Sequence, residues 1–233
     1  MVAGWKKIAW ARTEEPIDGQ IYVMNVDGSE ERLLASDPAD DESPSWSPDG
    51  RKIAFHSDRD GDDEIYVMNA DGSDIRQLTR NTANDEDPAW SPDGASIAFT
   101  RITGDCLDTC NAEIFVMDAS GSNERRLTRS PAYDAAPDWS PNGKRIAFNS
   151  DRGDNTEIYV MNTDGSAIKR LTRNIEGVLG DTAPSWSPDG RRIVFQSDHA
   201  GDDLEIDVVN ADGSGTRPLT RTRNQADECC PDW

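Results

Sequence analysis

The chain has 233 residues, of which 24 are basic and 45 acidic, for a formal net charge of −21. A surface this negative repels phosphate backbones and anionic lipid headgroups, so we expect neither nucleic-acid binding nor binding to anionic lipid. No apolar run approaches the roughly 20 residues of a membrane-spanning helix, so membrane insertion is not expected. The first residues also lack the apolar core of a signal peptide.

A short module with β-strand character recurs along the chain and is followed each time by a second half-module. The copies of the first run from Pro44 to Phe55, Pro88 to Phe99, Pro137 to Phe148 and Pro184 to Phe195. In every copy the isoleucine lies seven residues after the tryptophan, so the copies are in register. Self-similarity at this period predicts a repeat architecture.

Each repeat is predicted to form four short antiparallel strands, which in the second repeat would cover residues 45–47, 52–56, 64–69 and 76–79. Ser47-Pro48-Asp49-Gly50 predicts a tight turn, because proline presets φ at its second position and glycine accepts a left-handed fourth. Asp71-Gly72 predicts the turn into the last strand. The third strand is apolar on both faces, which is typical of a strand covered on both sides.

Four strands per repeat of about 45 residues indicate a propeller blade. The third-strand motif occurs five times, and so does the second-strand motif, which begins near Ile8, Ile53, Ile97, Ile146 and Ile193. We therefore predict an all-β fold, a single five-bladed propeller domain over residues 1–233.

The tryptophan strand that should precede Ile8 is missing, and one occurs instead at the far end as Pro231-Asp232-Trp233. We expect this C-terminal strand to pair with the N-terminal blade and close the propeller, which would remove exposed sheet edges. A fragment cut from a larger propeller at a blade junction remains the alternative.

The repeats Pro-x-Trp-Ser-Pro-Asp-Gly-x-x-Ile-x-Phe and Ile-Tyr-Val-Met-Asn-x-Asp-Gly-Ser resemble the WD-like repeats of TolB-type propellers over nearly the whole chain. Such relatives serve as periplasmic interaction platforms in bacteria, or as propeller domains of peptidases and some polysaccharide lyases. The resemblance implies a periplasmic or extracellular, bacterial protein-binding module. The best-known member has six blades and a helical N-terminal domain, so its partner surface does not carry over.

One position is acidic in all five repeats, three residues before the first-strand proline: Asp41, Asp85, Asp134, Asp181 and Glu228. The first strand of a blade lines the central channel, so these carboxylates would ring one channel mouth. Such an oxygen-rich ring suits a hard cation such as Ca²⁺. In the alternative, each acid shapes its own blade by accepting backbone N–H groups or by pairing with an arginine such as Arg80, Arg129, Arg173 or Arg221.

The irregular loops lie on the same predicted face. Residues 102–111 carry Cys106 and Cys110, whose spacing permits a local disulfide, and residues 174–181 present Val178 and Leu179 between two glycines. Binding usually resides on such variable loops, although tolerated insertions are the alternative. Adjacent Cys229 and Cys230 can hardly bridge each other, and a zinc site built from the two cysteine pairs fits the usual spacings poorly.

Catalytic motifs are absent from the sequence. No Gly-x-Ser-x-Gly elbow, His-Glu-x-x-His pair or glycine-rich phosphate loop occurs, and the two histidines, His56 and His199, belong to non-adjacent repeats. The acidic stretch 58–64 departs from the EF-hand template and predicts a solvated turn instead. No acid pair stands out for glycoside chemistry.

These observations predict a monomeric, non-catalytic interaction scaffold without a cofactor. Its acidic long-loop face would steer a basic protein partner through Asp41, Asp85, Asp134, Asp181, Val178 and Leu179. The first alternative is a Ca²⁺-dependent carbohydrate-binding or carbohydrate-active propeller, with its site at the channel mouth and the metal held by Asp41, Asp85, Asp134, Asp181 and Glu228. The second is a consensus-like or engineered repeat scaffold without a ligand.

Overall fold

The computed structural model describes residues 7–14, 17–34, 38–104, 110–153, 155–173, 180–198 and 204–220. The chain divides into two compact units, Met1–Ile97 with Met117–Glu124, and Ala98–Val116 with Arg125–Trp233. Each unit is described by itself. The predicted single domain over residues 1–233 therefore stays a prediction.

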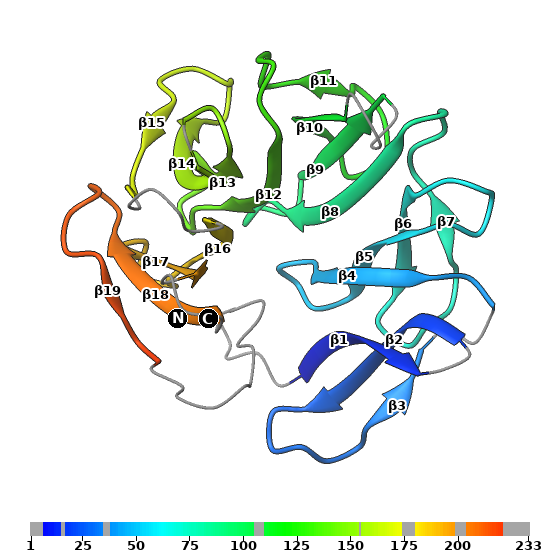
Figure 1. The fold of residues 1–233 in the computed structure, drawn as a ribbon. Coiled ribbons are helices and arrows are strands. Elements are labelled where there is room, and N and C mark those ends of the chain that lie inside the picture. The colour runs from blue at the N-terminus through cyan, green and yellow to red at the C-terminus, as the bar shows by residue number, and fades with distance from the viewer. Residues whose placement is uncertain are drawn as a thin grey trace. The chain divides into compact units, whose positions relative to one another are not determined.

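All regular secondary structure in the described residues is β, and it forms five antiparallel sheets (Figure 1). Four sheets have four strands in simple chain order, while the N-terminal sheet has three strands in the described part of the chain. This confirms an all-β fold of five propeller blades. The predicted closing strand at residues 231–233 lies outside the described residues.

The blades are numbered in chain order. Blade one contains β1 (Lys7–Glu14), β2 (Ile17–Asn25) and β3 (Arg32–Leu33). Blade two contains β4 (Asp41–Trp46), β5 (Lys52–Ser57), β6 (Glu64–Asn69) and β7 (Arg76–Gln77). Blade three contains β8 (Asn84–Trp90), β9 (Ser96–Thr103), β10 (Asn111–Asp118) and β11 (Arg125–Arg126). Blade four contains β12 (Asp134–Trp139), β13 (Arg145–Ser150), β14 (Glu157–Asn162) and β15 (Lys169–Arg170). Blade five contains β16 (Asp181–Trp186), β17 (Arg192–Asp198), β18 (Leu204–Asn210) and β19 (Arg217–Pro218).

The predicted Ser-Pro-Asp-Gly turn is confirmed in blade two. The N–H of Gly50 donates to the carbonyl of Ser47 at 2.8 Å, and Gly50 has a φ of +68°. The carboxylate of Asp49 accepts the hydroxyl of Ser47 at 2.8 Å and the N–H of Arg51 at 3.1 Å. These bonds lower the pKa of Asp49, with the Ser47 hydroxyl as the largest cause. The turn is thus fixed by its own four residues and the one that follows.

The first strand differs from its prediction, because β4 begins at Asp41 rather than at Ser45. Its pairing with β5 shifts register between Glu42 and Ser45, and Ser43 lies in the left-handed region with a φ of +48°. The corresponding residues of the next three blades are also in the left-handed region: Asp87, Ala136 and Ala183. This bulge before the proline has no glycine to mark it in the sequence. The fourth strand is also shorter than predicted and ends at Gln77.

The core lies between facing sheets of neighbouring blades. In the first unit, Ile21 and Val23 of β2 pack with Ile53 and Phe55 of β5 and with Met68 of β6. In the second unit, one cluster joins blades three and four through Ile114, Phe148 and Tyr159, and another joins blades four and five through Ile158, Val160 and Phe195. The central third strands are buried on both faces, as their composition predicted.

A second link between neighbouring blades is polar. A basic side chain on the fourth strand donates to a backbone carbonyl in the Asp-Gly turn region of the next blade. Arg32 reaches Asp71 at 3.2 Å, Arg125 reaches Thr163 at 2.8 Å, and Lys169 reaches Asp212 at 2.5 Å. These bonds hold each turn against the strand that precedes it.

Candidate functional site

The four described members of the repeated acid position are fully buried. Each is the first or second residue of the first strand of its blade and has no exposed surface: Asp41, Asp85, Asp134 and Asp181. The fifth, Glu228, lies outside the described residues. These groups therefore sit within the strand layer in this conformation, not on an open loop.

Two of these carboxylates hold an arginine of their own blade. Nη2 of Arg59 lies 2.8 and 3.0 Å from the two carboxylate oxygens of Asp41, and Nη2 of Arg152 lies 2.5 Å from Asp134 Oδ2. The Arg59 guanidinium also lies over the Tyr66 ring, 4.8 Å from its centroid. The partners thus come from the Ser-Asp-Arg segment after the second strand, so the predicted choice among Arg80, Arg129, Arg173 and Arg221 is wrong for these two acids.

The other two carboxylates accept neutral donors. The side-chain amide of Asn81 donates to Asp85 at 2.9 Å, and the hydroxyl of Ser197 donates to Asp181 at 2.6 Å. Among the described residues, no group of three or more His, Cys, Asp or Glu is placed to hold a metal ion. Contact of these acids with a partner or with Ca²⁺ stays a prediction.

Several predicted loop residues fall outside the described part of the chain: Val178, Leu179, Cys106, Cys229, Cys230 and His199. Cys110 is described and is disulfide-bonded. The predicted pairing of Cys106 with Cys110 stays a prediction, since the structure does not describe Cys106.

A second set of buried acids lies within the first three residues of the third strand of blades two to five: Glu64, Glu113, Glu157 and Glu205. In blade four, the hydroxyl of Thr172 donates to Glu157 at 2.6 Å and accepts the N–H of Ile158 at 2.9 Å. Arg170 pairs with the same carboxylate. Thr128 and Arg126 repeat this arrangement around Glu113. The sequence analysis missed these networks, although Glu and Thr recur at a fixed spacing.

Blade two lacks the arginine of this network. Gln77 occupies its position and donates to Asp60 instead. The carboxylate of Glu64 accepts the N–H of Asn81 and, at 3.2 Å, its side-chain amide. The pKa of Glu64 is raised to about 7, chiefly by burial, and the nearby Asp85 contributes to this rise.

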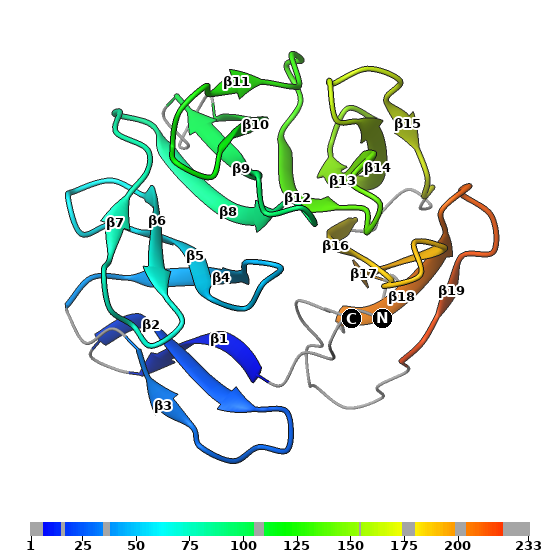
Figure 2. The same cartoon turned by 180° about the vertical axis from the view of Figure 1, so that it is seen from behind.

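A cluster of ionisable side chains lies where β8 packs against β4 and β5, and Figure 2 shows these three strands together from behind. We call His56, Glu42, Asp63, Glu86 and Asp87 the His56 cluster. The Nε2 atom of His56 lies 4.0 Å from Glu42 Oε2. Burial is the largest cause that raises the pKa of Glu42 and of Asp63, and it raises the pKa of Glu86 to about 7. These carboxylates crowd one another in a partly dehydrated site.

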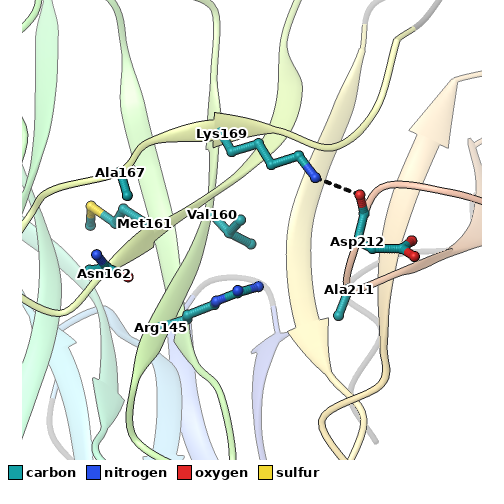
Figure 3. A pocket seen from close by; sticks show the side chains of 8 residues that line it. All are labelled: Arg145, Val160, Met161, Asn162, Ala167, Lys169, Ala211 and Asp212. Atoms are coloured by element: carbon teal, nitrogen blue, oxygen red, sulfur yellow. Dashed lines mark hydrogen bonds between the residues drawn. The ribbon is translucent and has the colours of Figure 1, made fainter.

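A cavity of about 460 Å³ opens between blades four and five on the side of the Asp-Gly turns (Figure 3). Val160, Met161 and Ala211 line its apolar part, and Arg145 and Lys169 supply positive charge. The bond from Lys169 to the carbonyl of Asp212 crosses one end. Such blade-to-blade bonds recur between blades one and two and between blades three and four.

The sequence profile of the TolB beta propeller domain matches residues 4–106 and again residues 105–232. The chain belongs to the TolB β-propeller domain family. The two matches together span nearly all of the sequence, in agreement with the five sheets.

Two solved TolB structures are similar to this TolB-family chain. Putative TolB from Agrobacterium tumefaciens shares 27% identity with a TM-score of 0.76, over 87% of this chain and 74% of its own. TolB from Acinetobacter baumannii shares 26% identity with a TM-score of 0.80, over 95% of this chain and 54% of its own. The chain thus spans about half the length of the second relative.

More distant likenesses concern the fold alone. An oligogalacturonate lyase in complex with manganese has a TM-score of 0.67 at 14% identity, over 92% of this chain and 62% of its own. A comparison with proteins of curated function finds no match. In the described residues, no helix is long and apolar enough to cross a membrane.

Proposed function

We propose that this TolB-family propeller is a non-catalytic interaction module that binds a basic protein partner in the periplasm or outside the cell. The observation that carries the proposal is the family match over nearly the whole chain. At the coarse level, the TolB-like fold supports a protein-interaction scaffold.

The net charge of −21 supports a basic partner, because a strongly negative surface accelerates encounter with positive ligands. Exposed and half-buried acids such as Asp58, Asp60 and Glu42 supply this field in blade two. The buried Asp41, Asp85, Asp134 and Asp181 would act indirectly, by fixing the strands and loops that carry the contact surface. Val178 and Leu179 remain the proposed apolar contacts.

Affinity capture tests the proposal. The immobilised chain would be incubated with a bacterial cell-envelope extract, and each captured protein would be identified, purified and titrated against the chain. We expect a basic partner whose affinity falls steeply between low and high salt. A partner of net negative charge, or binding that salt leaves unchanged, would refute the proposal of a basic partner.

The carbohydrate-active alternative is tested with Ca²⁺ and acidic oligosaccharides. Calorimetric titration with Ca²⁺, alone and with oligogalacturonate, would show heat and a raised melting temperature if the alternative holds. We expect neither. Release of unsaturated or shortened sugar products by the purified chain would overturn the non-catalytic assignment.

A further inference from the structure

The His56 cluster differs from the other buried acids in being particular to blades two and three. Glu42 and Glu86 are replaced by Ala135 and Thr182 in blades four and five. Asp63 is likewise replaced by Ala112, Thr156 and Leu204, and His56 by Thr100, Asn149 and Gln196. Because other blades fold with different residues at these positions, the fold of a blade does not explain the residues of the cluster.

Three carboxylates of the cluster, those of Glu42, Asp63 and Glu86, also lack the cation that accompanies similar carboxylates elsewhere in the chain. Asp41, Asp134, Glu113 and Glu157 each pair with an arginine. Within the described residues, the charged neighbours that act on Glu42, Asp63 and Glu86 are His56 and further acids, with no lysine or arginine. Those acids are Asp40 before β4, Asp58 and Asp62 in the loop after β5, and Asp87 of β8.

His56 provides an independent indication of a ligand. Its side chain is only 10% exposed, and its Nδ1 atom is buried with no hydrogen-bond partner. Because Phe55 faces blade one, the alternation of the strand directs His56 to the opposite face, toward β8 and its acids. A buried polar atom without a partner is costly, so His56 Nδ1 calls for a partner that the described residues do not supply.

The cluster is open to solvent on one side. The side chain of Glu42 is 44% exposed, whereas His56 lies beneath it. A group entering from solvent would therefore meet Glu42 before it approaches His56.

We propose that the His56 cluster is the docking site for an arginine side chain of the basic protein partner. This inference rests on the proposed function and names the residues and the partner group. A guanidinium presents five donors in a planar fork, which suits several carboxylates converging from two strands. It would supply the positive charge that is missing beside Glu42, Asp63 and Glu86.

The test uses a fluorescein-labelled arginine-rich peptide and the full chain. A matched peptide carries citrulline, which keeps the shape of arginine and removes its charge. The cluster variant is Glu42→Gln with Glu86→Gln. The control variant is Glu30→Gln with Asp74→Asn, because both residues are exposed acids outside the cluster. The titrations are made at pH 8, above the pKa of Glu86, where both variants remove close to two negative charges and general electrostatics affects them nearly equally.

We expect the cluster variant to bind the arginine peptide about tenfold more weakly, and the control variant less than about twofold more weakly. The citrulline peptide should bind poorly to every variant. Equal weakening in both variants, or equal binding of the two peptides, would overturn the docking site. A salt-sensitive basic partner of the proposed kind would still support the proposed function in that case.

Proton release gives a second readout. Since the pKa of Glu86 is raised to about 7, this carboxyl is partly protonated at neutral pH, and an adjacent cation favours its ionised form. Binding heats measured in buffers of different ionisation enthalpy should therefore differ for the wild type and agree for Glu86→Gln. Buffer-independent heats in the wild type would count against the site. Melting curves check that the variants fold, and removal of crowded charge should leave the melting temperature unchanged or higher.

Discussion

Buried carboxyl groups play two different parts in this chain. Asp41 and Glu157 recur at fixed places in the repeat, and each is held by an arginine and by the surrounding hydrogen bonds. Glu64 occupies the same repeated position as Glu157 but has Gln77 where blade four has Arg170. Burial is the largest cause of the raised pKa of Glu64, Asp85 adds to it, and Gln77 supplies no positive charge to offset it.

Substitution of Gln77 by arginine should restore the missing ion pair. The pKa of Glu64 is raised from its ordinary 4.5 to about 7 in the folded chain, so the folded state binds this proton more tightly than the unfolded state. Its contribution to the free energy of unfolding is fully present below about pH 4.5 and is lost as the pH rises through 7. Gln77→Arg should remove this loss and raise the free energy of unfolding at pH 8 by about 1 kcal/mol.

Urea unfolding at pH 5 and pH 8 measures the effect. The reciprocal change, Arg126→Gln in blade three, should create for Glu113 the dependence that Glu64 has in the wild type. If both variants show the wild-type difference between the two pH values, the arginine does not set the ionisation of these glutamates.

At the scale of the strands and turns, the Asp-Gly turns of blades two and four are fitted closely to the preceding blade. A Cβ added to Gly165 would lie 2.5 Å from the carbonyl oxygen of Leu127, and Gly165 has a φ of +84°. Gly50, in the Ser-Pro-Asp-Gly turn, has a φ of +68° and nothing within 4 Å of the added atom. Both glycines have a left-handed backbone, but only Gly165 contacts the neighbouring blade. A comparison of the two therefore distinguishes the cost of backbone strain from the cost of lost contact between blades.

Gly165→Ala should therefore destabilise the chain more than Gly50→Ala. Both substitutions place a side chain in the left-handed region, which costs about 1 kcal/mol. Gly165→Ala must in addition displace the turn from the strand behind it, for a total loss of about 2–4 kcal/mol. Thermal and urea unfolding of the two variants make the comparison. Equal losses would mean that the turn does not support the neighbouring blade.

The turns and the third strands could be predicted from the sequence, because a few adjacent residues determine each. Pro48 and Gly50 define one turn, and Ile65 to Met68 define a strand buried on both faces. The pre-proline bulge could not be predicted, since Ser43 and Ala183 carry no local sign of a left-handed conformation. The bulge lies between two paired segments of the strand, so the pairing of the strands in the sheet determines where it forms.

The candidate site was only partly accessible to sequence reasoning. Repetition identified the buried acid position of Asp41, but the choice of Arg59 as its partner depends on the path of the loop after β5. The His56 cluster was missed because its members come from three strands and a loop of two blades. An in-register comparison of the repeats could have found it, since Glu42 and Glu86 depart from Ala135 and Thr182 at one position.

At the scale of the whole chain, two pairs of successive blades, two with three and four with five, are joined by the same backbone contact. The N–H of Asp85 donates to the carbonyl of Asp63 at 2.7 Å, and the N–H of Asp181 donates to Thr156 at 2.8 Å. The first strand of each of these blades is thus tied to the loop before the third strand of the previous blade. Blade one has no first strand among the described residues, and β1 is the edge strand of its sheet there.

The predicted pairing of the strand ending at Trp233 with β1 would supply that first strand. Trp233→Ala should then destabilise the chain by about 3–5 kcal/mol, the usual cost of removing a packed tryptophan. Trp46→Ala, at the same repeat position in blade two, is the reference variant, because it measures the loss of stability when this tryptophan is removed from a complete blade. Hydrogen exchange of Lys7–Glu14 provides the decisive measurement, because amides on the outer edge of β1 are protected only if another strand pairs with them. Closure requires slow exchange in the wild type and fast exchange in Trp233→Ala, whereas fast exchange in both would show that β1 remains an open edge.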